Sequence, residues 1–494
     1  MTKSSNNFKK NKWNSSFAFL MAMIGAAVGL GNIWRFNYVL YSEGGGAFFI
    51  PYFTAILIMG IPFLILEYGV GYKFKDSLSN ILKKIKPKLE SLGWFVVLAV
   101  FLVLTYYIVI VGWDFIYLIL SFFKGWGADP NMFFANNIIV GGDNINAITQ
   151  LVLSVTAITA LLWALLWYVS HKSVDGIEKT VKILIPVLFI LMIFIVLYAL
   201  TLPGQMYGIT ELLKPDWSLL GDVGIWLAAF GQILFSLSMG QAMALTYASY
   251  LPEDAKLTDS VLLVVLANSA FEIFTAFGVF SILGFMCLQS GLPIEQVATS
   301  GTGLLFIVFP QIFNIMGDVA YILGPLFFLC VLFAGFTSII ALFEPMLNTI
   351  CMKFKLSRTK AASILTIIGF IISILFTTGA GNYLLTVVDE FLNQFAIVLG
   401  VILQAVIFGW IYGVDKIIPL VNKNSKFHVG KLWTIVIKVA LPIILTIMWI
   451  QGMLELIGSN DHITLAIEAI VTLILIIVPA ILTALPEKQL EDVN

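Results

Sequence analysis

Long, nearly uninterrupted runs of apolar residues constrain the fold of this chain more than any other feature of its sequence. Stretches of about 20 residues or more consist mainly of Leu, Ile, Val and Phe and carry almost no charge. In lipid, only α-helices and closed β-barrels satisfy all of their backbone hydrogen-bonding groups. The runs are well beyond the length of a barrel strand, so we expect an all-α membrane protein. The composition agrees, since 60% of the side chains are hydrophobic and only 11% are charged.

Counting about 20 apolar residues as one transmembrane helix predicts twelve spans. The predicted spans are 16–40, 45–72, 92–123, 146–170, 180–202, 223–249, 259–288, 319–351, 360–378, 383–413, 431–454 and 463–485. The residues before the first span are basic and polar, and no signal-peptidase site follows the first apolar run. Residues 1–15 are therefore expected to be a cytosolic N-terminal tail.

The distribution of basic residues predicts how the chain is oriented. With the N-terminus inside, all of the 27 Lys and Arg residues except Arg35, Lys124 and Lys214 fall on the cytosolic side. The positive-inside rule then places both termini in the cytosol. We expect a multi-pass protein of the inner (plasma) membrane, with longer loops on the outer side that are suited to cover an external entrance.

Several classes of function lack their signatures in this sequence. The three histidines, His171, His428 and His462, are scattered, and no nucleophile lies beside a base, so an enzyme is not expected. No repeated rings of charge or carbonyl groups indicate a channel. The cysteines show neither a disulfide framework nor a metal spacing, and no nucleic-acid partner is expected.

Two predicted spans are interrupted in the middle by small residues. The first contains GAAVGLG at 25–31 and the sixth contains SLSMGQA at 236–242. The second interruption comes five spans after the first, so the first ten spans divide into the blocks 16–202 and 203–413, with two further spans and the C-terminal tail in 414–494. Blocks with an odd number of spans lie upside down relative to each other, which is the inverted-repeat plan of secondary transporters.

Interrupted helices predict a binding site because they free backbone N–H and C=O groups, which lipid does not tolerate outside a protected cavity. Helices 1 and 6 are therefore predicted to be unwound at mid-membrane. Gly25 and Gly29 also fit the small-xxx-small pattern of close helix packing, which is the alternative interpretation of the first interruption.

The sequence GAAVGLGNIWRF at 25–36, followed by EGGGAFFIPY at 43–52, closely resembles the first two helices of the neurotransmitter:sodium symporter family. Bacterial members of that family have the LeuT-type fold with its 5+5 inverted repeat. The other matches are Tyr106 and Tyr107, Ser236 and Ser238, Tyr247 and Tyr250, Asn268, and Ala334 to Ser338. The resemblance implies a sodium-coupled symporter that imports a zwitterionic amino acid by alternating access.

The resemblance also implies two sodium sites. Sodium prefers hard oxygen ligands, and a broken helix offers carbonyl groups that its own hydrogen bonds no longer occupy. The first site would use the Ala27 carbonyl, the side chains of Asn32, Ser236 and Asn268, and the substrate carboxylate. The second would use the carbonyls of Gly25, Val28 and Ala334 and the hydroxyls of Thr337 and Ser338.

The substrate carboxylate is expected at the N–H groups of Leu30 and Gly31, where a half-helix presents its positive end, with the Tyr107 hydroxyl donating to it. The substrate amino group would face carbonyls around Ala27, Phe235 and Ser236 and the hydroxyl of Ser238. The rest of the pocket would consist of Ala26, Val103, Leu342 and Gln241. Gln241 either hydrogen-bonds a polar substituent of the substrate or braces the unwound backbone.

Two positions bear on the substrate class and on chloride. Monoamine carriers of the resembled family have an aspartate where this chain has Gly29, so the substrate here should bring its own carboxylate. Chloride-dependent members have a serine where this chain has Glu272, so no chloride is expected, and Glu272 is expected to exchange a proton in the return step. The alternatives are a sodium-dependent carrier of an amine or osmolyte, or a sensor that does not transport.

The resemblance places gates at both ends of the path. Outside, Arg35 would pair with Asp389, or with the neighbouring Glu390, above an aromatic lid formed by Tyr107 and Phe235. Inside, Trp13, Tyr250 and Lys10 match the internal gate, but Met352 stands where the family has an acid, so the partner of Lys10 stays open. Spans eleven and twelve offer a surface for lipid or for a homodimer.

Overall fold

The computed structural model describes residues 12–140, 145–299, 301–459 and 462–487. Throughout these residues the regular structure is helical, and the only pairing of the β type is one isolated bridge between Leu151 and Thr378. The predicted all-α class is confirmed. Lys10 and the rest of the predicted N-terminal tail up to residue 11 lie outside the described residues.

Ten helical segments of the described chain are long and apolar enough to cross a membrane. Their main helices are α3 (Phe49–Ala55) with α4 (Ile61–Phe74), α6 (Glu90–Ser121), α8 (Leu153–Ser170), α9 (Val174–Ala199), α13 (Leu257–Ser290), α17 (Ala320–Phe354), α18 (Arg358–Ser373), α19 (Gly381–Phe391) with α20 (Val398–Val406), α22 (Lys431–Ile435) with α23 (Leu441–Ser459), and α24 (His462–Ala484). The bent pair α1 (Ser16–Ala27) and α2 (Leu30–Ser42) adds an eleventh span. The predicted span 223–249 is instead two shorter helices, α11 (Val223–Ser236) and α12 (Met243–Ser249).

The break between α1 and α2 is a change of direction of 52° over two residues. Val28 and Gly29 both have extended backbones, with ψ angles of 100° and −165°. The last helical hydrogen bond of α1 runs from the Val28 N–H to the Ile24 carbonyl at 2.6 Å. The extended backbone of Val28 and Gly29 cannot continue this series of hydrogen bonds, so the helix ends here. The chain then restarts as a helix whose N-terminus points into the interior.

The gap between α11 and α12 has a different backbone. Ser238, Gly240 and Ala242 have positive φ angles of 51°, 71° and 57°, so every second residue of this segment is left-handed. This conformation costs about 1–2 kcal/mol for a residue with a side chain. The left-handed conformation persists only where the surrounding structure fixes the segment, and strained residues of this kind are concentrated at binding sites.

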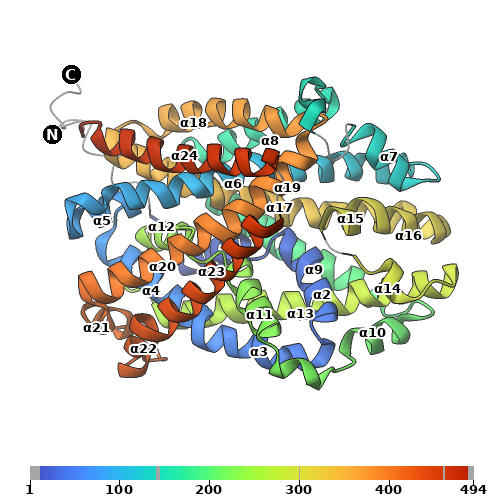
Figure 1. The fold of residues 1–494 in the computed structure, drawn as a ribbon, viewed down its shortest axis with the longest axis horizontal. Helices are drawn as coiled ribbons and strands as arrows, with labels where there is room; N and C mark the ends of the chain where they lie inside the picture. The colour runs from blue at the N-terminus through green and yellow to red at the C-terminus, as the bar shows by residue number, and fades with distance from the viewer. Residues whose placement is uncertain (1–11, 141–144, 300, 460–461, 488–494) are drawn as a thin grey trace.

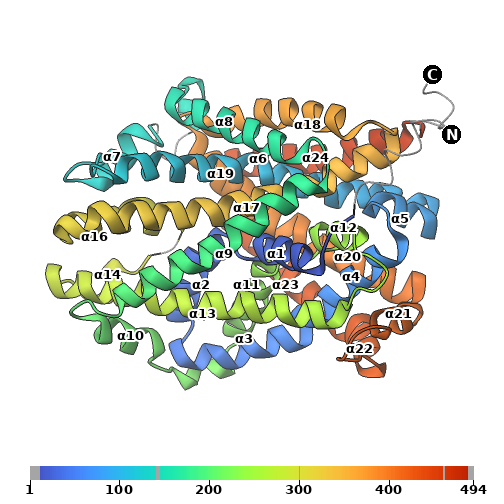
Figure 2. The same cartoon turned by 180° about the vertical axis from the view of Figure 1, so that it is seen from behind.

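The two broken helices lie inside the helical assembly. Figure 2 shows α1 near the centre, next to α9, α13 and α17, and these pairs are in direct contact. Figure 1 shows α12 near α4 and α11 near α3; α12 packs against α4 and α17, and α11 packs against α3 and α2. The interrupted segments are therefore covered by intact helices on several sides.

Short connecting helices gather at the two ends of the long axis in Figure 1. At one end are α5 (Leu78–Ile85) and α21 (Ile418–Asn422), in the Lys-rich loops that the charge pattern assigns to the cytosol. At the other end are α7 (Pro130–Asn137), α10 (Gln205–Leu213), α14 (Ile294–Val297) and α16 (Phe309–Ile315). The long loops predicted to lie on one side of the membrane thus do share one end of the molecule.

Candidate functional site

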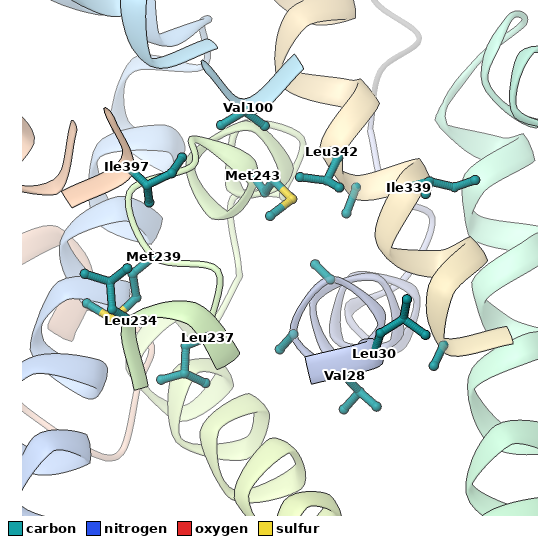
Figure 3. Close-up of a cluster of buried hydrophobic side chains, with 14 of the residues drawn as sticks. Val28, Leu30, Val100, Leu234, Leu237, Met239, Met243, Ile339, Leu342 and Ile397 are labelled. Atoms are coloured by element: carbon teal, nitrogen blue, oxygen red, sulfur yellow. The ribbon is translucent and has the colours of Figure 1, made fainter. Parts of the chain in front are cut away.

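The two helix breaks face each other across a buried cavity of about 60 Å³. The structure brings together at this cavity every residue that the sequence analysis placed in contact with the substrate. They are Ala26, Ala27, Leu30, Gly31, Val103, Tyr107, Phe235, Ser236, Ser238, Gln241 and Leu342. Three lining residues were missed, namely Tyr106, Met243 and Asn393. Figure 3 shows Met243 and Leu342, on α12 and α17, in the apolar part of this region.

The N-terminus of α2 forms the polar end of the cavity. The backbone N–H of Leu30 donates to the Tyr107 hydroxyl oxygen at 3.2 Å, which leaves the hydroxyl proton available to another acceptor. The first N–H groups of a helix lack partners within it and carry partial positive charge, so this end attracts an anionic group. A carboxylate is the simplest group that suits both the N–H groups at the start of α2 and the hydroxyl proton of Tyr107.

Gly29 and Gly31 are required by close contacts in this corner. A Cβ atom on Gly29 would lie 2.8 Å from the Ser338 hydroxyl oxygen and 3.2 Å from the Tyr107 hydroxyl oxygen. A Cβ atom on Gly31 would lie 2.4 Å from Cε1 of Phe235. An acidic side chain at position 29 therefore has no room unless its neighbours move.

Three polar side chains from three helices meet beside the break in the first span. The Asn32 amide donates to Oδ1 of Asn268 at 2.8 Å, and the Asn268 amide donates to the Ser236 hydroxyl at 2.5 Å. Ala27, whose carbonyl was predicted as a fourth ligand, lines the same cavity. This is a set of neutral oxygen atoms, which suits a hard monovalent cation. No cluster of three or more His, Cys, Asp and Glu side chains fit for a metal occurs in the part of the chain that the structure describes.

A second set of oxygen atoms joins α1 to α17. The Ser338 hydroxyl lies within hydrogen-bond distance of two carbonyl acceptors, Gly25 at 3.4 Å and Ala334 at 3.1 Å, and the Thr337 hydroxyl lies 3.1 Å from the same Ala334 carbonyl. Val28 completes the predicted set at the end of α1. A Cβ atom on Gly25 would approach Cβ of Thr337 to 3.1 Å, so glycine permits this close approach of the two helices.

Glu272 lies one helical turn beyond Asn268 on α13 and is fully buried. Its carboxylate accepts hydrogen bonds from the Tyr52 hydroxyl at 2.5 Å and from the Gln232 amide at 2.7 Å. These donors come from α3 and α11, so three helices converge on one negative charge. The donors form a ready anion site, and the carboxylate of the chain itself occupies it.

The outer gate residues surround the cavity, but the structure does not bring Arg35 and Asp389 together. Asp389 lines the cavity and accepts from the Tyr106 hydroxyl at 2.6 Å and from the Asn393 amide at 2.9 Å. The Arg35 guanidinium lies 5.0 Å from the ring centre of Phe235. Among the described residues Arg35 has no ion pair within 4 Å. Its cation–π contact and the neutral donors on Asp389 take the place of the predicted pair.

The Asp389 and Glu390 alternatives are distinguished by position. Asp389 lines the cavity, whereas Glu390 is exposed and does not. Arg35 lines a larger neighbouring cavity of about 320 Å³, which shares Phe235 and Asn393 with the first one. The pairing of Arg35 with Asp389 therefore stays a prediction, and it requires the two side chains to move toward each other.

The end predicted to face the cytosol is held together by contacts that sequence reasoning found only in part. The Trp13 indole donates to the Tyr247 carbonyl at 2.9 Å, and its backbone N–H donates to the Tyr250 carbonyl at 3.1 Å. The Tyr250 hydroxyl donates to Glu344 at 2.7 Å. Arg358 holds the same carboxylate with two bonds of 2.6 and 2.7 Å. The signal for this missed pair was a buried acid in an apolar run, which needs a partner.

The structure separates the two interpretations of Gln241. The carbonyl of Gly240, at the left-handed turn, accepts from the amide of Gln404 on α20 at 2.8 Å. Gln241 forms no hydrogen bond with any described residue, although it lines the cavity. Gln404 therefore holds the interrupted segment at Gly240. The sequence analysis missed this role because residues so far apart have no spacing that reveals their contact.

Known proteins resemble this chain over most of its length. Residues 10–132 and 127–485 match the model of the Sodium:neurotransmitter symporter family. An uncharacterised sodium-dependent transporter of Methanocaldococcus jannaschii is 39% identical over 89% of each chain. The human sodium- and chloride-dependent creatine transporter 1 is 29% identical over 82% of this chain and 71% of its own. The crystal structure of MhsT in complex with L-phenylalanine matches with a TM-score of 0.76, at 29% identity, over 90% of this chain and all of that one.

Proposed function

Because this chain belongs to the Sodium:neurotransmitter symporter family, a family of sodium-dependent transporters and not of enzymes, we propose that it imports a zwitterionic amino acid together with sodium ions. Transport would proceed by alternating access. The cavity between the two helix breaks is the proposed substrate site. The observation that carries the proposal is its polar end, where the N-terminus of α2 meets the Tyr107 hydroxyl and the hydroxyl proton is available to an acceptor.

The substrate carboxylate is proposed to bind at that point and to ligate sodium. The oxygen-bearing side chains of Asn32, Ser236 and Asn268 lie beside it, and a shared carboxylate would make the binding of ion and substrate cooperative. The lack of room at Gly29 supports a substrate that supplies its own negative charge, because no acidic side chain can stand in for it there. This favours an amino acid over a simple amine.

A second sodium ion is proposed between α1 and α17, at Gly25, Val28, Ala334, Thr337 and Ser338. Its release would free α1 from α17, which couples loss of the ion to opening of the inner side. Two charges moving across 100 mV contribute about 4.6 kcal/mol, since each contributes about 2.3 kcal/mol. At about 1.4 kcal/mol per tenfold, that supports more than three decades of substrate accumulation before the sodium gradient is counted.

Transport is proposed to be independent of chloride. Tyr52 and Gln232 would donate to a bound anion near the first ion, and Glu272 fills that position with a fixed charge. A chloride ion at the same donors would meet a carboxylate at short range, which opposes its binding. Glu272 is also proposed to take up a proton when sodium leaves, since its charge then lacks the ion.

The chain is proposed to lie in the inner (plasma) membrane with both termini in the cytosol, with residues 16–202 and 203–413 as inverted repeats. The breaks would then sit at mid-membrane. Arg35 with Asp389 would form the outer gate, and Trp13, Tyr250 and the Glu344–Arg358 pair would form the inner one. In the most apolar window of each of the last two spans only 22% of residues are buried, so these helices are proposed to face lipid or a second copy.

The test is uptake into proteoliposomes of purified protein, with an inward sodium gradient or with potassium in its place. A panel of the twenty amino acids, simple amines and betaine-type osmolytes separates the alternatives. Sodium-driven accumulation of at least one amino acid is the expected result. Accumulation of amines alone would contradict the role of Gly29, and sodium-dependent binding without any uptake would favour a sensor.

A further inference from the structure

The hydrogen bonds around the substrate cavity leave one polar side chain unused. Seven of the other polar side chains at this cavity have a hydrogen-bond partner within the protein. They are Asn32, Tyr106, Tyr107, Ser236, Ser238, Ser338 and Asn393. Asp389 is engaged by Tyr106 and Asn393. Among the described residues that line the cavity, Gln241 is the uncommitted hydrogen-bonding group.

Gln241 is nevertheless far from bulk solvent. The residue is only 7% exposed, and it lies between two left-handed residues, Gly240 and Ala242, which fix the direction of the backbone there. Neither atom of its amide is enclosed without a partner, so the amide opens into the cavity that the residue lines. A buried amide needs a partner on the donor and on the acceptor side, and the protein supplies none here.

The immediate surroundings limit what that partner can be. The side chains proposed for this part of the pocket beside Gln241, namely Ala26, Val103 and Leu342, are apolar, and so is Met243, which also lines the cavity. They offer no charge to balance an acidic or basic substrate side chain, and an unbalanced charge is costly to bury. The carboxylate that also lines the cavity, Asp389, already accepts hydrogen bonds from Tyr106 and Asn393. The cavity is also small, at about 60 Å³. A short, uncharged group with a hydrogen-bonding end fits these limits.

We infer that this transporter selects amino acids whose short, uncharged side chain ends in a hydroxyl or carboxamide group, and that Gln241 recognises that group. The inference rests on the proposed function, since it takes the cavity as an amino-acid site. An amide can donate to a hydroxyl or carbonyl oxygen and accept from O–H or N–H, so Gln241 suits both kinds of side chain. An apolar analogue of the same shape leaves the amide unpaired, which disfavours its binding.

Matched substrate pairs test the inference directly. Threonine and valine have nearly the same shape, as do asparagine and leucine, and each pair differs in hydrogen bonding. In sodium-dependent binding and uptake by the wild-type protein, the polar member of each pair should be preferred by about tenfold or more, which corresponds to about 1.4 kcal/mol. Equal affinity for threonine and valine overturns the inference.

Two variants locate the preference. Gln241→Met keeps the length of the side chain and removes the amide, so the preference for threonine over valine should fall to about twofold or less. Gln404→Met makes the same chemical change at the brace of Gly240, and it should weaken both substrates while the preference persists. A preference unchanged in Gln241→Met overturns the role of this residue.

The outcomes also separate the inference from the proposed function. If valine or leucine is taken up with sodium as well as its polar partner, the inference is wrong and the amino-acid symporter stands. If no amino acid shows sodium-dependent binding or uptake, both are wrong. The wild-type comparison needs no variant, so it decides the question even where a substituted protein fails to fold.

Discussion

Replacing Glu272 with serine should make sodium binding depend on chloride. The carboxylate is fully buried, and Asn268, a proposed sodium ligand, lies one helical turn away on α13. Neighbours one turn apart on a helix are about 6 Å from each other. At about 6 Å and an effective dielectric constant of about 20, the attraction between the carboxylate and the ion is about 3 kcal/mol. Its loss corresponds to a decrease of about a hundredfold in sodium affinity.

Sodium titrations of amino-acid uptake in proteoliposomes measure this effect, with either chloride or gluconate as the anion. The wild-type protein should respond equally in both. Glu272→Ser should need about a hundredfold more sodium in gluconate and recover most of that loss in chloride, because chloride can accept from Tyr52 and Gln232. Glu272→Gln fills the same space without charge and should stay weak in both anions. A serine variant with wild-type sodium activation in gluconate refutes the reasoning.

Three further substitutions test other parts of the structure. Thr337→Ala removes a proposed ligand of the second ion, and uptake should then need at least about tenfold more sodium, as a titration would measure; an unchanged titration would contradict the site. Gly240→Ala puts a side chain at a φ of 71°, with its Cβ 2.2 Å from a methyl group of Val401, and thermal unfolding should show that the protein loses more than about 1–2 kcal/mol of stability. The control Gly291→Ala has the same φ in open space and should lose only the cost of the left-handed backbone. Glu344→Gln leaves the buried guanidinium of Arg358 with a neutral partner and should destabilise the closed inner end by about 3 kcal/mol. The accessibility of cysteines at that end to a thiol reagent measures this effect. Equal accessibility in the variant and the wild-type protein would show that the pair does not hold the inner end closed.

The sequence predicted the helical class and the residues around the cavity because both depend on local signals. Apolar runs of span length identify helices without knowledge of their neighbours, and the small residues at 25–31 and 236–242 mark the places where a helix stops. In the structure α1 ends at Ala27 and α11 ends at Ser236. The position of these breaks in the membrane stays a prediction, since the chain alone does not define the bilayer.

Pairings between distant residues could not be predicted in the same way. Gln404 bonds to Gly240, and Arg358 bonds to Glu344, through contacts that only the packed helices create. The partner of Arg35 was likewise predicted without knowledge of its surroundings. In the structure the Arg35 guanidinium lies against the Phe235 ring, and its pairing with Asp389 stays a prediction. Where a side chain has several possible partners, three-dimensional packing determines which one it contacts, and the spacing of residues along the chain does not show this.

Trp13 is held by two hydrogen bonds, one from its indole and one from its backbone N–H, and this makes it a suitable fluorescent reporter of the proposed transport cycle. Its ring is 4% exposed, packs edge-on against Tyr247 and shares hydrogen bonds with the residues that end α12. In the proposed cycle, opening of this end breaks these contacts and transfers the indole from a buried, aromatic environment to water. In a variant that keeps Trp13 as its only tryptophan, the fluorescence emission would then shift to longer wavelength each time the inner end opens to release substrate.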